Sequence, residues 1–251
     1  MNRNIKLTIE YDGTNFQGWQ VQKNNRTVQG SIETALKTIF GKTIKLYGSG
    51  RTDSGVHALG QVANFKISTL MSLDEITKAI NGNIPKDIAI LSAEEVSRDF
   101  HAQYSAKIKT YRYTILYRKN RCALQRNHCL HYPGKLDIRS MKEEAKSLLG
   151  KKDFKSFQAS DPAKKIKALK NSTVRNISDI KIKRKADLLI IEITGNGFLY
   201  KMVRNIVGTL LEIGRGKLAK DSIRDILAKK DRSAASFTAK AHGLSLVSVK
   251  Y

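Results

Sequence analysis

Strand-like and helix-like segments succeed one another along this chain, and this succession constrains its fold most. Residues 5–11 alternate between apolar and polar side chains, which predicts a strand that ends at the turn Asp12-Gly13. Apolar residues from Val28 to Phe40 recur at helical spacing, with Thr27 as a candidate N-cap and Gly41 as the stop. The fold class that this pattern predicts is α+β, with mixed or antiparallel sheets.

The same patterns predict the remaining elements. A capping box of Ser72 and Glu75 marks one helix start. Further strands are predicted at 44–47, 61–65, 88–91, 110–117, 180–182 and 189–193, and further helices at 138–149, capped by Asp137 and stopped by Gly150, and at 203–211, ended by Gly214.

A polar, irregular stretch at 98–109 predicts a boundary between two α+β halves. We place these domains at 1–105 and 106–251 and expect a cleft between them. The segment 161–170 contains four lysines and a proline and is predicted to be a mobile loop.

An excess of basic residues indicates the class of partner. Lys and Arg number 46 against 22 Asp and Glu, a formal net charge of +24. Such a charge exceeds what solubility requires and favours a polyanion, with nucleic acid first. A surface that is simply rich in lysine, as in some ribosomal proteins, would give the same charge without any catalysis.

Other features of composition predict a cytoplasmic protein. No apolar run approaches the roughly 18 residues of a membrane span, and residues 1–5 show no signal-peptide pattern. Two cysteines, Cys122 and Cys129, fit a reducing compartment and form no disulfide framework.

Asp53 stands in a glycine-rich segment, with glycines at 48, 50 and 55 and Arg51 two residues before it. Glycines let the backbone approach a ligand closely while the carboxylate projects from a turn. Asp53 is therefore a candidate nucleophile or base, with Arg51 as a candidate phosphate or base contact. The alternative is an Asx turn in which Asp53 bonds its own backbone, and spacing alone favours that alternative.

Arg204 and Tyr111 are candidate partners of this loop. Arg204 lies at the margin of an apolar helix, where a buried charge needs a partner such as Asp53, which it would hold ionised. Otherwise its side chain reaches past its neighbours to water. Tyr111 and Tyr113 share a predicted strand, where tyrosines usually pack, although one at a cleft edge can stack on an extruded base.

Histidines and cysteines do not form a standard metal motif. The spacing of Cys122, His128, Cys129 and His131 matches no standard zinc pattern, so no metal site is predicted. His57 lacks a nucleophile and an orienting acid nearby in sequence and is interpreted as an RNA or loop contact.

Five blocks of residues, in order, resemble the tRNA pseudouridine synthase A family. The second block, Gly50-Arg51-Thr52-Asp53-Ser54-Gly55-Val56-His57-Ala58, is the most specific. Lys240 and His242 depart from the family, in which prolines often precede the final Gly-Leu pair. The other four blocks are residues 11–20, 109–113, 197–205 and 243–244, so the resemblance runs nearly end to end.

The resemblance implies the pseudouridine synthase fold and a role for each candidate residue. Asp53 is implied as the nucleophile, Arg204 as its ion-pair partner, and Tyr111 as the residue that stacks on the target uracil. Arg51 is implied to help flip the base, and His57 and Leu244 are expected substrate contacts. Family members act as homodimers, without metal or cofactor, on uridines 38, 39 and 40 of the tRNA anticodon arm.

Two other functions remain open at this point. A non-catalytic RNA-binding module, associated with tRNA or the ribosome, accounts for the charge but not for Asp53 in its glycine-rich loop. A metal-dependent nuclease is the more distant alternative.

Overall fold

A computed structural model of the chain describes residues 2–160 and 172–251. These residues form two compact α+β units, the first consisting of Met1–Lys107 with Ser245–Tyr251 and the second of Ile108–Leu244. The α+β class predicted from sequence is confirmed. The predicted loop at 161–170 lies outside the described residues.

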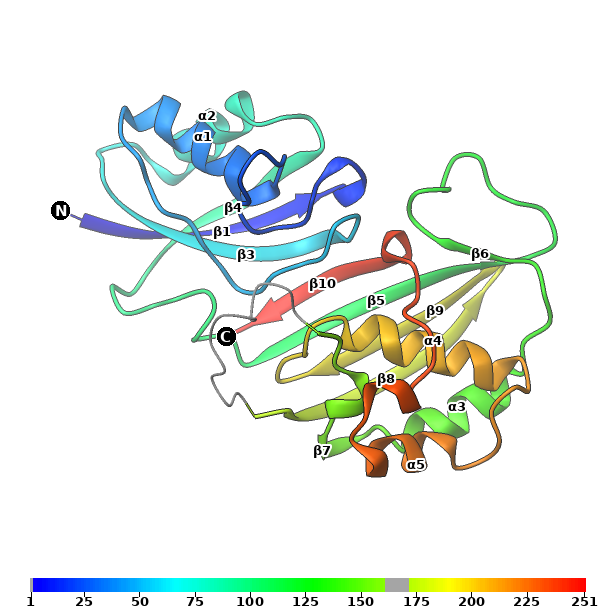
Figure 1. The fold of residues 1–251 in the computed structure, drawn as a ribbon. Helices are drawn as coiled ribbons and strands as arrows, with labels where there is room; N and C mark the ends of the chain where they lie inside the picture. Colours follow the sequence, from blue (N-terminus) through cyan, green and yellow to red (C-terminus); the bar gives the residue numbers. More distant parts are fainter. Residues whose placement is uncertain (1, 161–171) are drawn as a thin grey trace. The chain divides into compact units, whose positions relative to one another are not determined.

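The first unit is a sheet with two helices on one face (Figure 1). The strand order is β4-β1-β3-β10, with β2 paired to β3. Neighbouring strands run antiparallel except β10, which runs parallel to β3. Its elements are β1 (Asn2–Tyr11), a 3-10 turn η1 (Gly13–Asn15), α1 (Val28–Phe40), β2 (Tyr47–Gly48), β3 (His57–Ser68), α2 (Leu73–Asn83), β4 (Ile88–Val96) and β10 (Leu244–Lys250).

The local signals in this unit act as expected. The Thr27 side chain accepts from the Gly30 amide at the start of α1, and Gly41 ends that helix with φ 68°. Ser72 and Glu75 form both bonds of the capping box of α2. The core consists of alternate β1 residues and the apolar faces of the helices: Ile5, Leu7, Ile9, Ile32, Leu36, Ile76 and Ile80 are all fully buried.

The prediction of a strand at 44–47 is wrong except for its last residue, Tyr47. Ile44 and Leu46 are buried, but only Tyr47 and Gly48 pair with β3. The Leu46 amide donates to Glu33 Oε1 at 3.0 Å, and its carbonyl accepts from Gln29 Nε2 at 3.1 Å. Side chains of α1 thus satisfy the Leu46 main chain in place of a neighbouring strand.

The second unit also combines a sheet with helices (Figure 1). The strand order is β5-β9-β8-β7, with β6 parallel to the end of β5. Its elements are β5 (Ile108–Tyr117), β6 (Leu130–Tyr132), α3 (Ile138–Lys146), β7 (Gly150–Asp153), η2 (Lys155–Phe157), β8 (Val174–Lys185), β9 (Leu188–Gly195), α4 (Met202–Gly214), α5 (Ser222–Lys229), η4 (Arg232–Ala234) and η5 (Ala241–Gly243).

Several boundaries differ from the sequence-based expectation, and two of these differences have a clear structural cause. Helix α3 ends at Lys146 rather than Leu149, because the amides of Leu148 and Leu149 bond to carbonyls three residues back and tighten the chain into turns. The last strand, β10, places residues 245–251 with the first unit, since Ser245 pairs with His57. The division predicted from sequence, between residues 105 and 106, assigns this strand to the second half instead.

Candidate active site

Asp53 lies in the first unit, in the loop between β2 and β3, and is half-buried. Main-chain hydrogen bonds hold the loop on both sides of it. The Trp19 amide donates to the Thr52 carbonyl at 3.1 Å, the Gly55 amide donates to the Phe16 carbonyl at 3.3 Å, and the Val56 amide donates to the Asp53 carbonyl at 3.2 Å. The carboxylate therefore projects from a backbone with a defined course.

Glycines let residues 13–18 lie directly against this loop. A Cβ atom on Gly13 would lie 2.0 Å from the Val56 carbonyl oxygen, and one on Gly18, whose φ is +91°, would lie 2.6 Å from that of Thr52. The Tyr11 hydroxyl is 2.8 Å from Thr52 Oγ1. Burial raises the pKa of Tyr11 far above its usual value, so it stays a neutral hydrogen-bonding group.

A buried amide supports the start of the same loop. Gln61, on β3, is fully buried and accepts from Ser49 Oγ at 2.7 Å through Oε1. Its Nε2 donates to the Gly50 carbonyl at 3.0 Å. The loop is thus bonded to β3 before Asp53 and to residues 16–19 around it.

The other two candidates of this unit differ in accessibility. Arg51 is exposed, so its guanidinium is available to a ligand. His57 is only 4% exposed. Its Nδ1 accepts from the Gly13 amide at 3.0 Å and lies 3.1 Å from Asp12 Oδ1. These contacts tie His57 to the segment that packs against the loop, and its expected RNA contact stays a prediction.

Tyr111 lies on β5 of the second unit, opposite Ile193 of β9. Its ring is 9% exposed and meets Phe198 edge to face, with centroids 5.2 Å apart. Tyr113, two residues along the strand, is fully buried and donates from its hydroxyl to the Lys240 carbonyl at 2.8 Å. Burial raises the pKa of Tyr113, and the charge of Arg204 acts in the opposite direction.

Arg204 projects from α4 and is half-buried. Its Nε donates to the Ala239 carbonyl at 2.7 Å, and the Ala239 amide donates back to the Arg204 carbonyl at 3.1 Å. Leu244, 5% exposed, comes directly after η5 and begins β10. A Cβ on Gly243 would lie 2.6 Å from the Tyr113 ring, so the segment 239–244 lies tightly against both β5 and α4.

Comparison with known proteins identifies the family. A model described as tRNA pseudouridine synthase matches residues 7–105 and 145–251. The chain belongs to this family. It is accordingly an isomerase, and the resemblance inferred from the five motifs is confirmed.

Full-length relatives carry the same description. tRNA pseudouridine synthase A of Thermoanaerobacter sp. (strain X514) is 46% identical over 249 residues, covering 99% of this chain and 100% of the relative. That of Caldicellulosiruptor saccharolyticus is 48% identical with the same coverage. Among solved structures, a Cbf5-Nop10-Gar1 complex matches with a TM-score of 0.35 and 10% identity, covering 96% of this chain and 57% of that one.

Three residues beside Arg204 in this pseudouridine synthase had no role in the sequence-based prediction. Asn205, Arg232 and Thr238 hydrogen-bond to one another and hold the segment that carries Ala239. One signal was present in the sequence, because Asn205 interrupts the apolar face of a helix that is otherwise buried. Its partners, 27 and 33 residues away, left no local signal.

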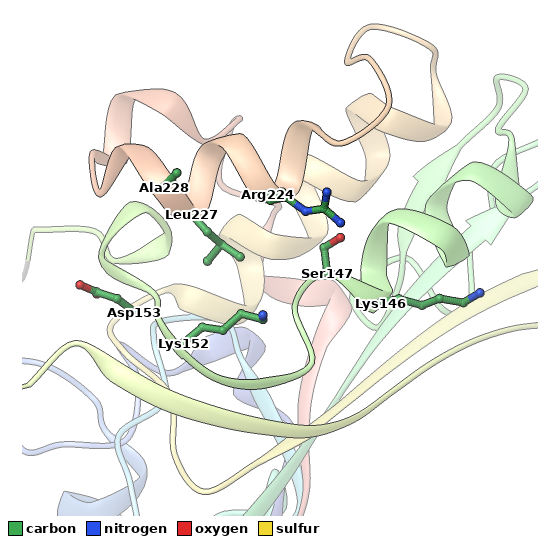
Figure 2. Close-up of a pocket in the computed structure, with 7 residues that line it drawn as sticks. All are labelled: Lys146, Ser147, Lys152, Asp153, Arg224, Leu227 and Ala228. Carbon is green, nitrogen blue, oxygen red and sulfur yellow. The ribbon is translucent and has the colours of Figure 1, made fainter.

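A hollow of about 540 Å³ opens elsewhere in the second unit of this family member (Figure 2). Two of its charges have ion-pair partners, since Lys146 Nζ bonds Glu143 at 2.7 Å and Asp153 Oδ2 lies 3.6 Å from Lys230 Nζ. No candidate site residue lines it. The lining residues come from α3, β7, α5 and the turn after α3: Lys146, Ser147, Lys152, Asp153, Arg224, Leu227 and Ala228.

Three of the four cysteines and histidines considered as metal ligands have hydrogen bonds to other groups. Cys129 Sγ donates to the Gln125 carbonyl at 3.2 Å, and the Gln125 amide donates to Cys122 Sγ at 3.3 Å. His131 Nε2 lies 3.0 Å from the Arg118 carbonyl.

Among residues 2–160 and 172–251, no helix is long and apolar enough to cross a membrane.

Proposed function

We propose that this protein converts uridines 38, 39 and 40 in the anticodon arm of tRNA to pseudouridine, with Asp53 as the nucleophile. The observation that carries the proposal is the combination of family membership over nearly the whole chain with Asp53 in a loop shaped by main-chain bonds. The net charge of +24 suits a polyanionic substrate.

The reaction needs a carboxylate but no redox cofactor. The N1–C1′ glycosidic bond breaks, the uracil turns, and a C5–C1′ bond forms. The C5 proton leaves to solvent and N1 gains a proton, so the substrate and product are isomers. Three first steps are open to Asp53, namely addition to C6, attack on C1′, or removal of the C2′ proton, and each uses the ionised carboxylate.

The remaining candidates support this step in the proposal. Arg204 pairs with Asp53 and favours its anion. Tyr111 stacks on the uracil once the base has left the helix, which offsets part of the few kcal/mol that extrusion costs. Arg51 aids extrusion, and His57 and Leu244 complete the substrate contacts.

We further propose that the protein acts as a cytoplasmic homodimer and requires no metal. Sedimentation equilibrium tests the dimer. Dialysis against a chelator tests whether a metal is required. Activity should persist after dialysis, and loss of activity would favour metal-assisted chemistry instead.

The decisive experiment replaces the carboxylate with its isosteric amide. Asp53→Asn should abolish tritium release from tRNA labelled at uracil C5 in a single-turnover assay, while tRNA binding persists. Asp74→Asn, an exposed residue in the first turn of α2, is the matched control and should retain the wild-type rate.

Retained turnover in a pure Asp53→Asn or Asp53→Ala preparation would reject Asp53 as the nucleophile. No tritium release by the wild-type protein on unmodified tRNA would reject the reaction itself and leave a non-catalytic RNA-binding module. Mapping pseudouridines in tRNA from cells that lack this gene, with and without complementation, tests the three positions.

A further inference from the structure

A fully buried amide lies next to Arg204 on α4. Asn205 is 0% exposed and uses both ends of its side chain. Its Nδ2 donates to the Phe157 carbonyl at 2.7 Å, and its Oδ1 accepts from Thr238 Oγ1 at 2.6 Å and from Arg232 Nη2 at 3.1 Å. Only a side chain with both a donor and an acceptor satisfies all three partners.

Arg232 fastens the same segment at further points. Its Nη2 also donates to Thr238 Oγ1 at 3.2 Å, and its Nη1 donates to the Ala235 carbonyl at 3.0 Å. Thr209, one turn after Asn205 on α4, accepts from the Ser236 amide at 3.3 Å. Residues 235–239 are therefore bonded repeatedly to α4 and to Arg232.

Close packing against the helix fixes this segment further. A Cβ atom on Gly208 would lie 1.8 Å from the Phe237 carbonyl oxygen, so the main chain of 237 reaches the helix only at a glycine. Ala239 follows two residues later and is fully buried. The position of its carbonyl, which accepts from Arg204 Nε, thus depends on the bonds around Thr238.

We propose that Asn205, Arg232 and Thr238 are positioning residues, which hold the Ala239 carbonyl so that it orients the guanidinium of Arg204 for the reaction. This inference rests on the proposed function, in which Arg204 is the partner of Asp53. The group that orients Arg204 is a main-chain carbonyl, and its place is set by side-chain hydrogen bonds between residues 27 and 33 positions apart.

Orientation matters for an arginine because its side chain has several rotatable bonds and its guanidinium is planar. A hydrogen bond at Nε sets the plane of the group and leaves both Nη groups for other partners. Groups oriented before the reaction need no reorganisation during it, and small misplacements reduce rates strongly. Loosening Ala239 should slow the chemical step without changing how tRNA binds.

The test removes one hydroxyl and keeps the shape of its side chain. Thr238→Val should lower the single-turnover rate constant, measured with saturating enzyme in excess over C5-tritiated tRNA, by about tenfold, equivalent to roughly 1.4 kcal/mol. Thr238→Ser keeps the hydroxyl and should remain within about twofold of wild type. The Kd for tRNA should not change in either variant.

Thr173→Val is the matched control. Its hydroxyl also makes a 2.6 Å bond in the same unit, to Asp153 Oδ1, whereas the hydroxyl of Thr238 bonds Asn205. A purely structural role for Thr238 would reduce the fraction of active protein. With enzyme in excess, that loss leaves the rate constant of the remaining active molecules unchanged.

A second measurement follows Arg204 directly. In ¹⁵N-labelled protein, the Nε proton of Arg204, assigned by its loss in Arg204→Lys, should exchange with solvent slowly and at least several-fold faster in Thr238→Val. Wild-type rate constants and unchanged exchange in Thr238→Val would overturn the positioning role. If the wild-type protein releases tritium, that result leaves the proposed function intact, whereas absence of wild-type release rejects the function itself.

Discussion

The loop that carries Asp53 and the helix that carries Arg204 are held in place by different means. Around Asp53 the contacts are largely main chain to main chain, and Gly13 and Gly18 allow two backbones to touch. Around Arg204 the backbone also touches α4, at Gly208, but most of the hydrogen bonds involve side chains, with Asn205 as the common partner of Arg232 and Thr238.

This difference determines how each region responds to change. Main-chain contact tolerates little added volume, because neither backbone can move without disturbing its own hydrogen bonds. A side-chain network can lose one bond and keep the others, so its failure is graded. Substitutions near Asp53 should therefore act more steeply than the Thr238 substitutions near Arg204.

The largest effect is expected from Gly13→Ala. The new methyl group would lie 2.0 Å from the Val56 carbonyl oxygen, and Val56 bonds to Asp53. We expect a loss of roughly 2–3 kcal/mol in the free energy of unfolding, as overpacking produces. Urea denaturation measures it, and the tritium-release rate should fall further than in Thr238→Val.

Gly82→Ala provides the control for that substitution in the same unit. Gly82 is exposed in α2, and nothing lies within 4 Å of an added Cβ. The change should stabilise the protein by about 0.5–1 kcal/mol through helix propensity. If Gly13→Ala did not lower the free energy of unfolding, the proposed difference between the Asp53 and Arg204 regions would be rejected.

Substitutions of Tyr111 test the comparison in the second unit. Its ring, next to Phe198, is what the proposal assigns to stacking, so Tyr111→Phe should keep most of the single-turnover rate. Tyr111→Ala should lose about tenfold or more, because base stacking contributes roughly 1–3 kcal/mol. Equal rates in the two variants, at equal thermal stability, would count against stacking.

The smallest effect concerns Lys109, which precedes Tyr111 on β5. Burial lowers the pKa of Lys109 from 10.5 to about 8. Below pH 8 the folded protein must keep this partly buried amine charged, which destabilises it. Between pH 8 and 10.5 the unfolded chain binds more protons than the folded one, so this penalty declines as pH rises.

Comparison with Lys109→Met isolates this contribution. The full shift corresponds to roughly 3–4 kcal/mol, and because the side chain stays partly exposed we expect a contribution of about 1 kcal/mol. Lys109→Met should be more stable than the wild type at pH 7. Urea denaturation should show that the difference in their free energies of unfolding narrows towards pH 10.5. A gap that is constant with pH would contradict the lowered pKa.

Much of the first unit could be predicted from sequence because its signals are local. Thr27 and Gly41 delimit α1, and Ser72 with Glu75 starts α2. The strand expected at 44–47 failed because burial alone does not decide pairing: the main chain of Leu46 found side-chain partners on α1 instead.

The second unit was predicted less completely. α5, β6 and β7 were not anticipated, and α3 proved shorter than its apolar pattern indicated. These elements are short, and their burial depends on neighbours far along the chain rather than on a long periodic pattern. In the first unit, β10 was missed for the same reason, since its parallel pairing with β3 joins residues almost 190 positions apart.

The sequence by itself determined the α+β class, the family, the basic character and the candidates Asp53, Arg204 and Tyr111, because motifs and periodicity are local properties of a chain. Tertiary structure decided how those side chains are held. It set Gly13 and Gly18 against the Asp53 loop and brought Asn205, Arg232 and Thr238 together beside Arg204. Hydrogen bonds and close packing between distant residues form only in the folded chain, so no local pattern records them.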